Sequence, residues 1–302
     1  MTIKSQLVEI IKQAESAKAS DIHFVNEGEE ILMQFRIGAL MLPQRYLTMD
    51  EYQQLLAYIK FHAALNLTHP KQPQSGLLTL EDEGGGVYAR VSILPTQKFQ
   101  SLVLRIINSG SQRTLDEIPL FKQNADVLKE MVNNRAGLVL ISGPTGSGKT
   151  TTTYGFIHYL KQSLGKSIIT IEDPVEYQQP DIVQMQVNES LGMTYDIGIK
   201  EILRHDPDVI IIGEIRDPLT ARQALRAALT GHLVISTVHA KNVIGTFHRL
   251  LDLGISLPDL EQAIIGVANQ RLVEAENDYK ALFEFCFGET LDAVVAGLAH
   301  GK

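Results

Sequence analysis

Hydrophobic positions along the chain follow one pattern up to about residue 107 and a different one from about residue 137 onward. In the first part, apolar residues recur at helical spacing over residues 3–17 and alternate with polar residues over residues 21–25 and 31–37. Residues 1–107 are therefore predicted to form a small α+β domain with a mostly antiparallel sheet. The remaining elements predicted in it are a helix over residues 50–67, strands over residues 77–80, 88–94 and 102–106, and a glycine-rich loop over residues 81–86.

The second pattern indicates a parallel sheet. Polar residues with glycine, serine and a closing proline predict a linker over residues 108–119, followed by a helix over residues 121–134. Short, nearly continuous apolar runs then alternate with helical stretches, which is typical of parallel strands buried on both faces. These runs cover residues 137–142, 167–171, 209–212 and 232–237. From residue 242 the chain is predicted to be mainly helical, so that residues 120–302 form one α/β domain.

The most specific motif lies directly after the first of these runs. Residues 143–150 match G-x-x-x-x-G-K-[ST] between a predicted strand and a predicted helix, which is the context that a phosphate-binding loop requires. Backbone N–H groups and the helix N-terminus of such a loop bind phosphate, and its lysine reaches the β- and γ-phosphates. ATP and Mg²⁺ are therefore the expected ligands, with the Thr150 hydroxyl on Mg²⁺. The predicted ATP-binding residues are Gly143, Pro144, Thr145, Gly146, Ser147, Gly148, Lys149, Thr150 and Thr151.

Acidic residues and histidines mark the ends of the neighbouring strands. Glu172 and Glu214 follow two of the apolar runs, and ligands of parallel sheets bind at the carboxyl ends of the strands. One carboxylate would orient the attacking water, and Glu214 is also a predicted Mg²⁺ ligand. The alternative is that these acids are solvated or cap the next helix. His232 and His239 flank the fourth strand, and sensing of the γ-phosphate, a neutral structural role and metal binding stay open for them.

Composition narrows the class of protein. Asp and Glu outnumber Lys and Arg by 35 to 27, and the formal net charge of −8 lacks the basic footprint of a dedicated nucleic-acid-binding protein. The single cysteine, Cys286, excludes an internal disulfide framework and a four-cysteine zinc site. The N-terminal segment resembles no export signal, and the apolar runs are too short to span a bilayer. We expect a soluble, cytoplasmic protein that reaches a membrane only by docking on a partner.

Several of these segments together resemble the signatures of the type II secretion and type IV pilus ATPases. Residues 203–217 (LRHDPDVIIIGEIRD) are similar to the most specific signature of that family, and residues 171–177 and 230–239 resemble its Asp box and His box. Residues 269–273 (NQRLV) resemble a C-terminal motif, and residues 20–23 (SDIH) resemble the start of an N-terminal domain. The resemblance covers essentially the whole chain.

The resemblance implies a RecA-like P-loop ATPase domain preceded by a small PAS-like domain, assembled as a homo-hexamer. It also implies that two arginines of the N-terminal domain contact the nucleotide, and Arg90 and Arg105 match those positions. Glu214 then belongs to the Walker B element and Glu172 to the Asp box, and which of the two activates water stays open.

Features that the chain lacks indicate the branch of the family. The four-cysteine zinc insertion, the extra N-terminal domain and the C-terminal A-I-R-N-L-I-R-E retraction motif are missing, while residues 279–284 resemble the short competence ATPases of Gram-positive bacteria. The expected function is an ATPase motor that powers assembly of a competence pilus or pseudopilus for DNA uptake. Its expected partner is a membrane platform protein, with no direct contact to nucleic acid. Alternatives are pilus retraction, type II protein secretion, a nucleotide-binding scaffold with little turnover, and a motor acting on DNA.

Overall fold

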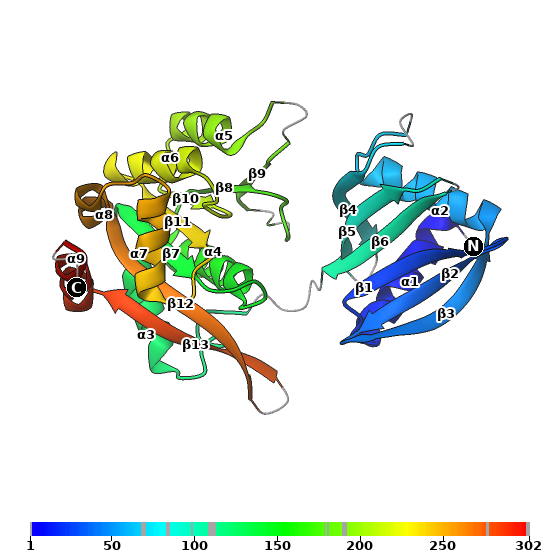
Figure 1. Cartoon of the computed structure of the whole chain (residues 1–302), viewed down its shortest axis with the longest axis horizontal. Coiled ribbons are helices and arrows are strands. Elements are labelled where there is room, and N and C mark those ends of the chain that lie inside the picture. Colours follow the sequence, from blue (N-terminus) through cyan, green and yellow to red (C-terminus); the bar gives the residue numbers. More distant parts are fainter. Residues whose placement is uncertain are drawn as a thin grey trace. The chain divides into compact units, whose positions relative to one another are not determined.

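A computed structural model of the chain describes residues 2–67, 71–82, 85–97, 99–107, 113–177, 179, 181–188, 192–275 and 278–299, without the side chains of residues 81, 82, 85 and 86. The chain divides into two compact units, Met1–Gly110 and Ser111–Lys302, and each is described by itself (Figure 1). Both units combine helices with a sheet, in agreement with the α/β class expected from the sequence.

The first unit is an antiparallel sheet packed against two helices. The strand order is β3-β2-β1-β6-β5-β4, and all neighbouring strands run antiparallel, as predicted. Buried side chains from both helices and from the strands form one apolar core. The strands are β1 (Asp21–Glu27), β2 (Glu30–Ile37), β3 (Leu40–Thr48), β4 (Gln74–Asp82), β5 (Gly85–Pro95) and β6 (Gln100–Ile107), and the helices are α1 (Ile3–Ser16) and α2 (Met49–His62).

Local chemistry explains where the helices of this unit begin. The Thr2 hydroxyl accepts a hydrogen bond from the Ser5 N–H at the start of α1. Thr48 and Glu51 form a reciprocal capping box at the start of α2, which satisfies two N–H groups that the helix itself leaves unpaired. α2 ends at His62, so the prediction that it reaches residue 67 is wrong.

This unit also contains one strand that was not predicted and one predicted loop that is wrong. β3 was not predicted, because it lies at the edge of the sheet and only one of its nine residues is buried, which leaves no apolar alternation to detect. Residues 81–86 were predicted as a loop, but β4 continues to Asp82 and β5 begins at Gly85, with these two residues paired. A hairpin therefore replaces most of the predicted loop.

The second unit contains a sheet covered by helices on both faces. The strand order is β13-β12-β7-β11-β10-β8-β9, and β13 alone runs antiparallel to its neighbour. The strands are β7 (Gly137–Ser142), β8 (Ile168–Glu172), β9 (Val183–Gln186), β10 (Val209–Ile212), β11 (Leu233–Val238), β12 (Ile264–Ala275) and β13 (Asp278–Phe287). The helices are α3 (Gln123–Val132), α4 (Lys149–Leu164), α5 (Tyr195–Ile202), α6 (Pro218–Leu229), α7 (Val243–Asp252), α8 (Leu257–Ala263) and α9 (Glu289–Ala299), with a 3₁₀ turn, η2 (Leu203–His205).

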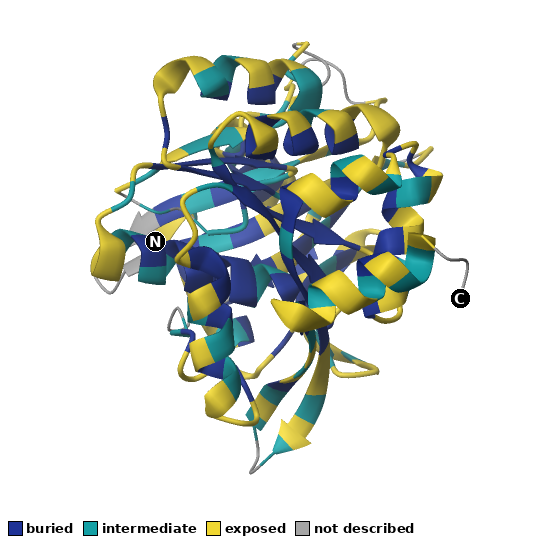
Figure 2. Ribbon diagram, turned by 90° about the vertical axis from the view of Figure 1, so that its left-hand side faces the viewer, coloured by how far each residue is buried: buried dark blue, intermediate teal, exposed yellow. Residues whose placement is uncertain are grey.

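Alternate residues of the central strands enter two separate cores. Ile210 and Ile212 of β10 pack in the core that includes α6 and α7, while Val209 and Ile211 pack in the core that includes α3 and α4. Every residue of β7, β8, β10 and β11 is buried, as the dark blue strands in Figure 2 show. This double burial explains why these strands read as continuous apolar runs in the sequence.

Two predictions for the second unit need correction. The C-terminal part is not mainly helical, because residues 264–275 and 278–287 form β12 and β13. Residues 113–119 do not form a linker either, because Leu115 and Ile118 are buried in a core and Pro119 bridges to Ala281. Residues 108–112, the rest of the predicted linker, lie outside the described residues.

Candidate nucleotide-binding site

The predicted phosphate loop connects the carboxyl end of β7 to the N-terminus of α4, and close packing requires glycine at two of its positions. Gly143 and Gly148 have φ angles of 153° and 84°. A Cβ at Gly143 would lie 2.4 Å from the carbonyl oxygen of Gln270, and one at Gly148 would lie 2.8 Å from the Gln270 side-chain nitrogen. No other residue type fits these positions, because larger side chains would collide with β12 and disfavour the backbone conformation.

Two buried amide side chains of β12 hold the phosphate loop in place. The fully buried Gln270 donates from Nε2 to the Ser147 carbonyl at 2.7 Å and accepts from the Thr152 hydroxyl at 2.8 Å. Its neighbour Asn269 donates to the Ser142 hydroxyl at 2.9 Å, at the end of β7. Two side chains of one strand therefore fix the loop at both ends. Asn269 and Gln270 belong to a segment that resembles a family motif, for which the sequence alone predicts no role, and these hydrogen bonds supply one.

The interior of the loop presents positive charge and a hydroxyl without a partner. Lys149 is 8% exposed, and its ammonium donates to the carbonyls of Gly143 and Pro144 at 3.0 Å each. Burial lowers the pKa of Lys149, and the nearby Glu214 opposes this shift. The buried Ser147 hydroxyl has no hydrogen-bond partner among the described residues. Glycines, a cation, a free hydroxyl and the N-terminus of α4 converge here, so the residues present fit a bound polyphosphate.

Charged side chains from two neighbouring strands meet beside the loop. Glu214 follows β10 and forms an ion pair with Arg216, and the His239 ring that follows β11 lies 3.4 Å from the Glu214 carboxylate (Nε2 to Oε2). Burial, followed by the positive charge of Lys149, lowers the pKa of His239, while Glu214 acts in the opposite direction. Lys149, Glu214, Arg216 and His239 therefore form one electrostatic cluster at the carboxyl edge of the sheet, as the strand-end rule predicts.

Glu172 lies at the end of β8 in a network of its own. Its carboxylate is 7% exposed and accepts hydrogen bonds from the hydroxyls of Thr170 and Tyr154 at 2.6 and 2.7 Å, and from the Gln184 amide at 3.2 Å. Tyr154 belongs to α4 and Gln184 to β9, so this carboxylate joins the phosphate-loop helix to the edge of the sheet. Three donors occupy three of the roughly four acceptor positions of a carboxylate.

The structure does not bring the other predicted histidine to the loop. His232 precedes β11, and its Nδ1 atom lies 3.2 Å from the Ala227 carbonyl oxygen at the end of α6. A strand of six residues spans roughly 20 Å, at about 3.3 Å per residue. His232 and His239 therefore lie at opposite ends of one strand, and His232 belongs to the amino-terminal edge of the sheet.

The two predicted arginines lie in the first unit. Arg90 on β5 and Arg105 on β6 are paired directly across the sheet. Arg105 donates to the buried carboxylate of Asp21 on β1 at 2.8 Å, and the Arg90 side chain is exposed. Burial opposes ionisation of Asp21, but hydrogen bonds from Ser20 and Arg105 outweigh it and lower the pKa of Asp21. Arg105 is therefore already paired with a carboxylate, and the exposed Arg90 lies directly beside it across the sheet.

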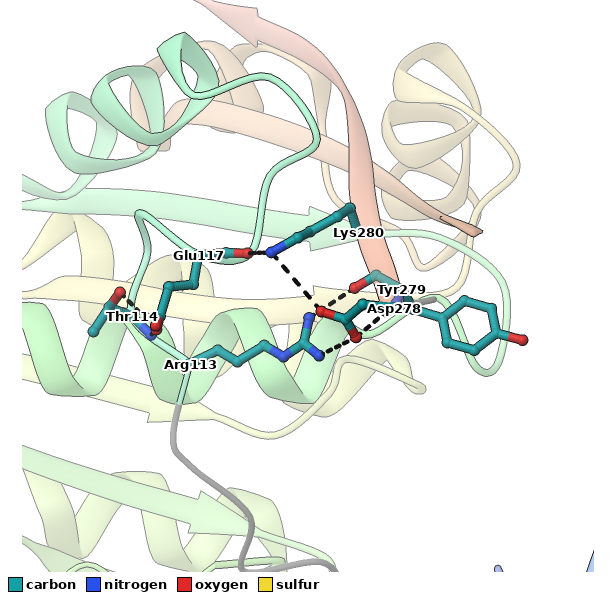
Figure 3. A network of polar contacts seen from close by, with 6 residues as sticks. All are labelled: Arg113, Thr114, Glu117, Asp278, Tyr279 and Lys280. Carbon is teal, nitrogen blue, oxygen red and sulfur yellow. Dashed lines mark hydrogen bonds and ion pairs between the residues drawn. The ribbon is translucent and has the colours of Figure 1, made fainter. Parts of the chain in front are cut away.

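A cavity of about 200 Å³ adjoins the phosphate loop on the side of β12 and β13. Thr151 of α4, Leu272 of β12 and Tyr279 of β13 line it together with Arg113. The Arg113 guanidinium is held by the Tyr279 carbonyl at 2.7 Å and by the Asp278 carboxylate at 2.5 Å (Figure 3). The cavity borders the phosphate loop at Gly148 and has apolar walls at Ile118 and Leu272, so it is placed to receive a nucleobase.

The surrounding contacts fix this cavity. Lys280 donates to the Glu117 carbonyl at 2.7 Å, and Glu117 in turn accepts from the backbone and hydroxyl of Thr114 (Figure 3). The hydrogen bond from Arg113 lowers the pKa of Asp278. Arg113 and Tyr279 were not predicted as site residues, because no local pattern joins positions 166 residues apart.

Among the residues that the structure describes, no group of three His, Cys, Asp or Glu side chains could hold a metal ion. Across the same part of the chain, no helix is long and apolar enough to cross a membrane.

The sequence matches the family described as "Type II/IV secretion system protein" over residues 1–290, and the chain belongs to that family. It is 40% identical to the competence protein ComGA of Bacillus subtilis over 298 residues, which cover 97% of this chain and 84% of that protein. It is also 40% identical to the type II secretion system protein E of Dickeya dadantii over 276 residues, covering 90% of this chain and only 54% of that longer protein.

Solved structures of secretion and pilus ATPases share the fold. The pilus retraction motor PilT with bound ADP superimposes with a TM-score of 0.77 at 30% identity, covering 96% of this chain and 86% of that one. The ATPase DotB of Legionella pneumophila gives a TM-score of 0.76 at 25% identity, covering 99% of this chain and 84% of that one. The predicted fold class, a P-loop ATPase domain preceded by a small α+β domain, and the predicted family are confirmed.

Proposed function

We propose that this protein is an ATPase motor that powers assembly of a competence pilus or pseudopilus for DNA uptake. The observation that carries the proposal is the cluster of Lys149, Glu214 and His239 at the mouth of a glycine loop that fits polyphosphate. The likeness to a competence protein over 97% of the chain supports the biological role. In this proposal the chain acts in the cytoplasm as a homo-hexamer docked on a membrane platform protein.

The phosphate loop binds the triphosphate of ATP through residues 143–151. Lys149 exchanges its two carbonyl contacts for the β- and γ-phosphate oxygens, which removes a buried ammonium from neutral partners and pairs it with negative charge. The cavity between Thr151 and Tyr279 receives the base. Mg²⁺ would neutralise charge that develops on the phosphates, and Thr150 and Glu214 are the residues that would hold it.

We assign the orientation of the attacking water to Glu172. About one acceptor position of its carboxylate remains after the three hydrogen bonds from Thr170, Tyr154 and Gln184, and these donors fix the carboxylate in place. Glu214 has Arg216 and His239 as neighbours and acts on the metal side. Arg90 and Arg105 are proposed to contact the nucleotide from the first unit.

Steady-state hydrolysis by the purified full chain tests this division of roles. Glu172→Gln is expected to lose turnover by at least about a hundredfold while nucleotide affinity stays near that of the wild type. Glu214→Gln is expected to raise the Mg²⁺ concentration needed for half-maximal turnover. Full turnover in Glu214→Gln at every Mg²⁺ concentration would show that Glu214 does not hold the metal. Full turnover in Glu172→Gln would show that Glu172 does not orient the attacking water.

A deletion strain tests the biological role. We expect it to lose both transformation and displayed pili, because an assembly motor is needed to build the filament. Pili that form but fail to shorten would favour the retraction role instead, for which the likeness to PilT is the motivating observation. Hydrolysis that is absent with and without the platform protein would favour a nucleotide-binding scaffold.

A further inference from the structure

The first unit carries a half-open cavity of about 290 Å³ beside α2. It lies between this helix and the start of β6, within a single unit, and none of the predicted site residues lines it. Its apolar walls include Met49, Leu56, Leu67 and Phe99. Leu67 is 54% exposed, so apolar surface continues to the mouth of the cavity.

The cavity also contains a buried cation. Lys60 is only 4% exposed, although lysine is almost never fully buried without a charged partner. Its ammonium donates to the side-chain carbonyl of Gln100 at 2.7 Å, and Tyr52 donates to the backbone carbonyl of the same residue. No carboxylate lies within ion-pair distance of Lys60 in the described part of the chain.

This arrangement is unfavourable in the free protein. Transfer of an ammonium from water to an apolar site is costly unless an anion compensates for it, and a neutral amide does so only in part. Burial accordingly lowers the pKa of Lys60. A methionine at this position would fill a similar volume without the cost, so packing alone does not account for a lysine here.

We infer that the cavity between α2 and β6 is a binding site for an apolar group that carries one carboxylate, with Lys60 as its ion-pair partner. One buried cation matches one negative charge, and the apolar walls match the body of the ligand. The volume lies at the lower limit for ligand pockets, which suits a small acid or one acidic side chain with its apolar neighbours. The ligand can therefore be a free carboxylic acid or an acidic segment of a partner protein.

The defined probe is 4-phenylbutyrate, and 4-phenylbutyramide is the matched neutral compound. Met49 lines the cavity, so its methyl signal in the full chain with labelled methionine methyl groups reports binding at this site, and Met49→Leu assigns the signal. We expect saturable shifts with the carboxylate and roughly tenfold weaker binding of the amide, because a charge-assisted hydrogen bond is lost.

Variants separate the role of the charge from that of packing. Lys60→Met is expected to abolish the preference for the carboxylate and to raise the melting temperature, whereas Lys60→Arg keeps the preference. Lys4→Met, at an exposed position on α1, is the control and leaves both measurements unchanged. Equal affinity for the two compounds, no binding of either at millimolar concentration, or an unchanged preference in Lys60→Met would overturn the inference.

A second arm identifies the source of the ligand. The probe is a short helical peptide with leucines along one face and a single central glutamate, compared with the same peptide carrying glutamine. Tighter binding of the glutamate peptide than of 4-phenylbutyrate, again lost in Lys60→Met, assigns the site to a partner protein. Tighter binding of 4-phenylbutyrate assigns it to a free acid.

Discussion

Replacing Gln270 by leucine tests whether β12 shapes the phosphate loop. The substitution keeps the side chain about the same size but removes the amide that donates to the Ser147 carbonyl and accepts from the Thr152 hydroxyl. The side chain is fully buried, and leucine offers no polar atom to replace either contact. The loop then loses its tie to β12, although every residue of the G-x-x-x-x-G-K-[ST] motif remains.

The magnitude follows from the two polar groups left without partners. Each buried, unsatisfied group costs about 1–3 kcal/mol, so Gln270→Leu should lower the free energy of unfolding by roughly 2–6 kcal/mol. One of the two groups is the Ser147 carbonyl of the loop itself. We therefore expect ATP affinity to fall by at least about tenfold, equivalent to about 1.4 kcal/mol.

Thermal unfolding with and without nucleotide, together with titration of a fluorescent ATP analogue, measures both effects. Wild-type protein at a ligand concentration of 100 times Kd should gain about 2.7 kcal/mol, and the variant should gain less at the same concentration. Thr152→Val is the matched variant on α4, because it removes the hydroxyl that donates to the Gln270 side chain. A double-mutant cycle of Gln270→Leu and Thr152→Val should give a coupling free energy of about 1 kcal/mol or more. Unchanged nucleotide affinity in a destabilised Gln270→Leu protein would refute the role in shaping the loop.

Three further predictions concern other contacts. Tyr279→Ala should weaken binding of ATP by roughly tenfold but leave binding of inorganic triphosphate unchanged, as measured by competition, because Tyr279 lines the proposed base cavity. Asp21→Asn should lower the free energy of unfolding by about 1–3 kcal/mol at neutral pH. Because the pKa of Asp21 is lowered from its ordinary value of 3.8, the ionised carboxylate stabilises the wild-type fold at pH values above 3.8 and this contribution is lost as the pH falls, so the variant should lose less stability than the wild type in urea titrations at decreasing pH. Burial raises the pKa of Cys286 from 9.0 to about 11, so the free energy of unfolding should decline as pH rises from 9 to about 11. Cys286→Ala should remove this pH dependence, and the thiol of the native protein should react with a disulfide reagent only on unfolding.

The elements predicted best are those whose environment is the same on both faces. β7 and β10 begin and end at the predicted residues, because a strand buried on both faces needs a continuous apolar run. β3 gave no such signal, since solvent covers most of an edge strand. Leu115 and Ile118 were missed for a related reason: two apolar residues in a polar segment have no period, and only contact with the second core reveals their burial.

The same distinction applies to the candidate site. Lys149, Glu214 and His239 could be brought together from the sequence, because each follows an apolar run and parallel strands end at one edge. His232 was placed with them because it adjoins the same run, yet it precedes the strand, and the direction of the strand decides which edge it reaches. Tyr154, Gln270 and Arg113 depend on contacts between distant segments, which no periodicity encodes.

β12 explains both the largest error in the predicted fold and the main omission from the predicted site. A strand beside β7 would be apolar if it served packing alone, but Asn269 and Gln270 are buried there at 3% and 0% exposure. Buried polar groups are tolerated only when they are hydrogen-bonded, and these two bind Ser142 and the phosphate loop. The polar residues that support the loop therefore interrupt the apolar run by which a buried strand is recognised, so the structural and functional signals compete at the same positions.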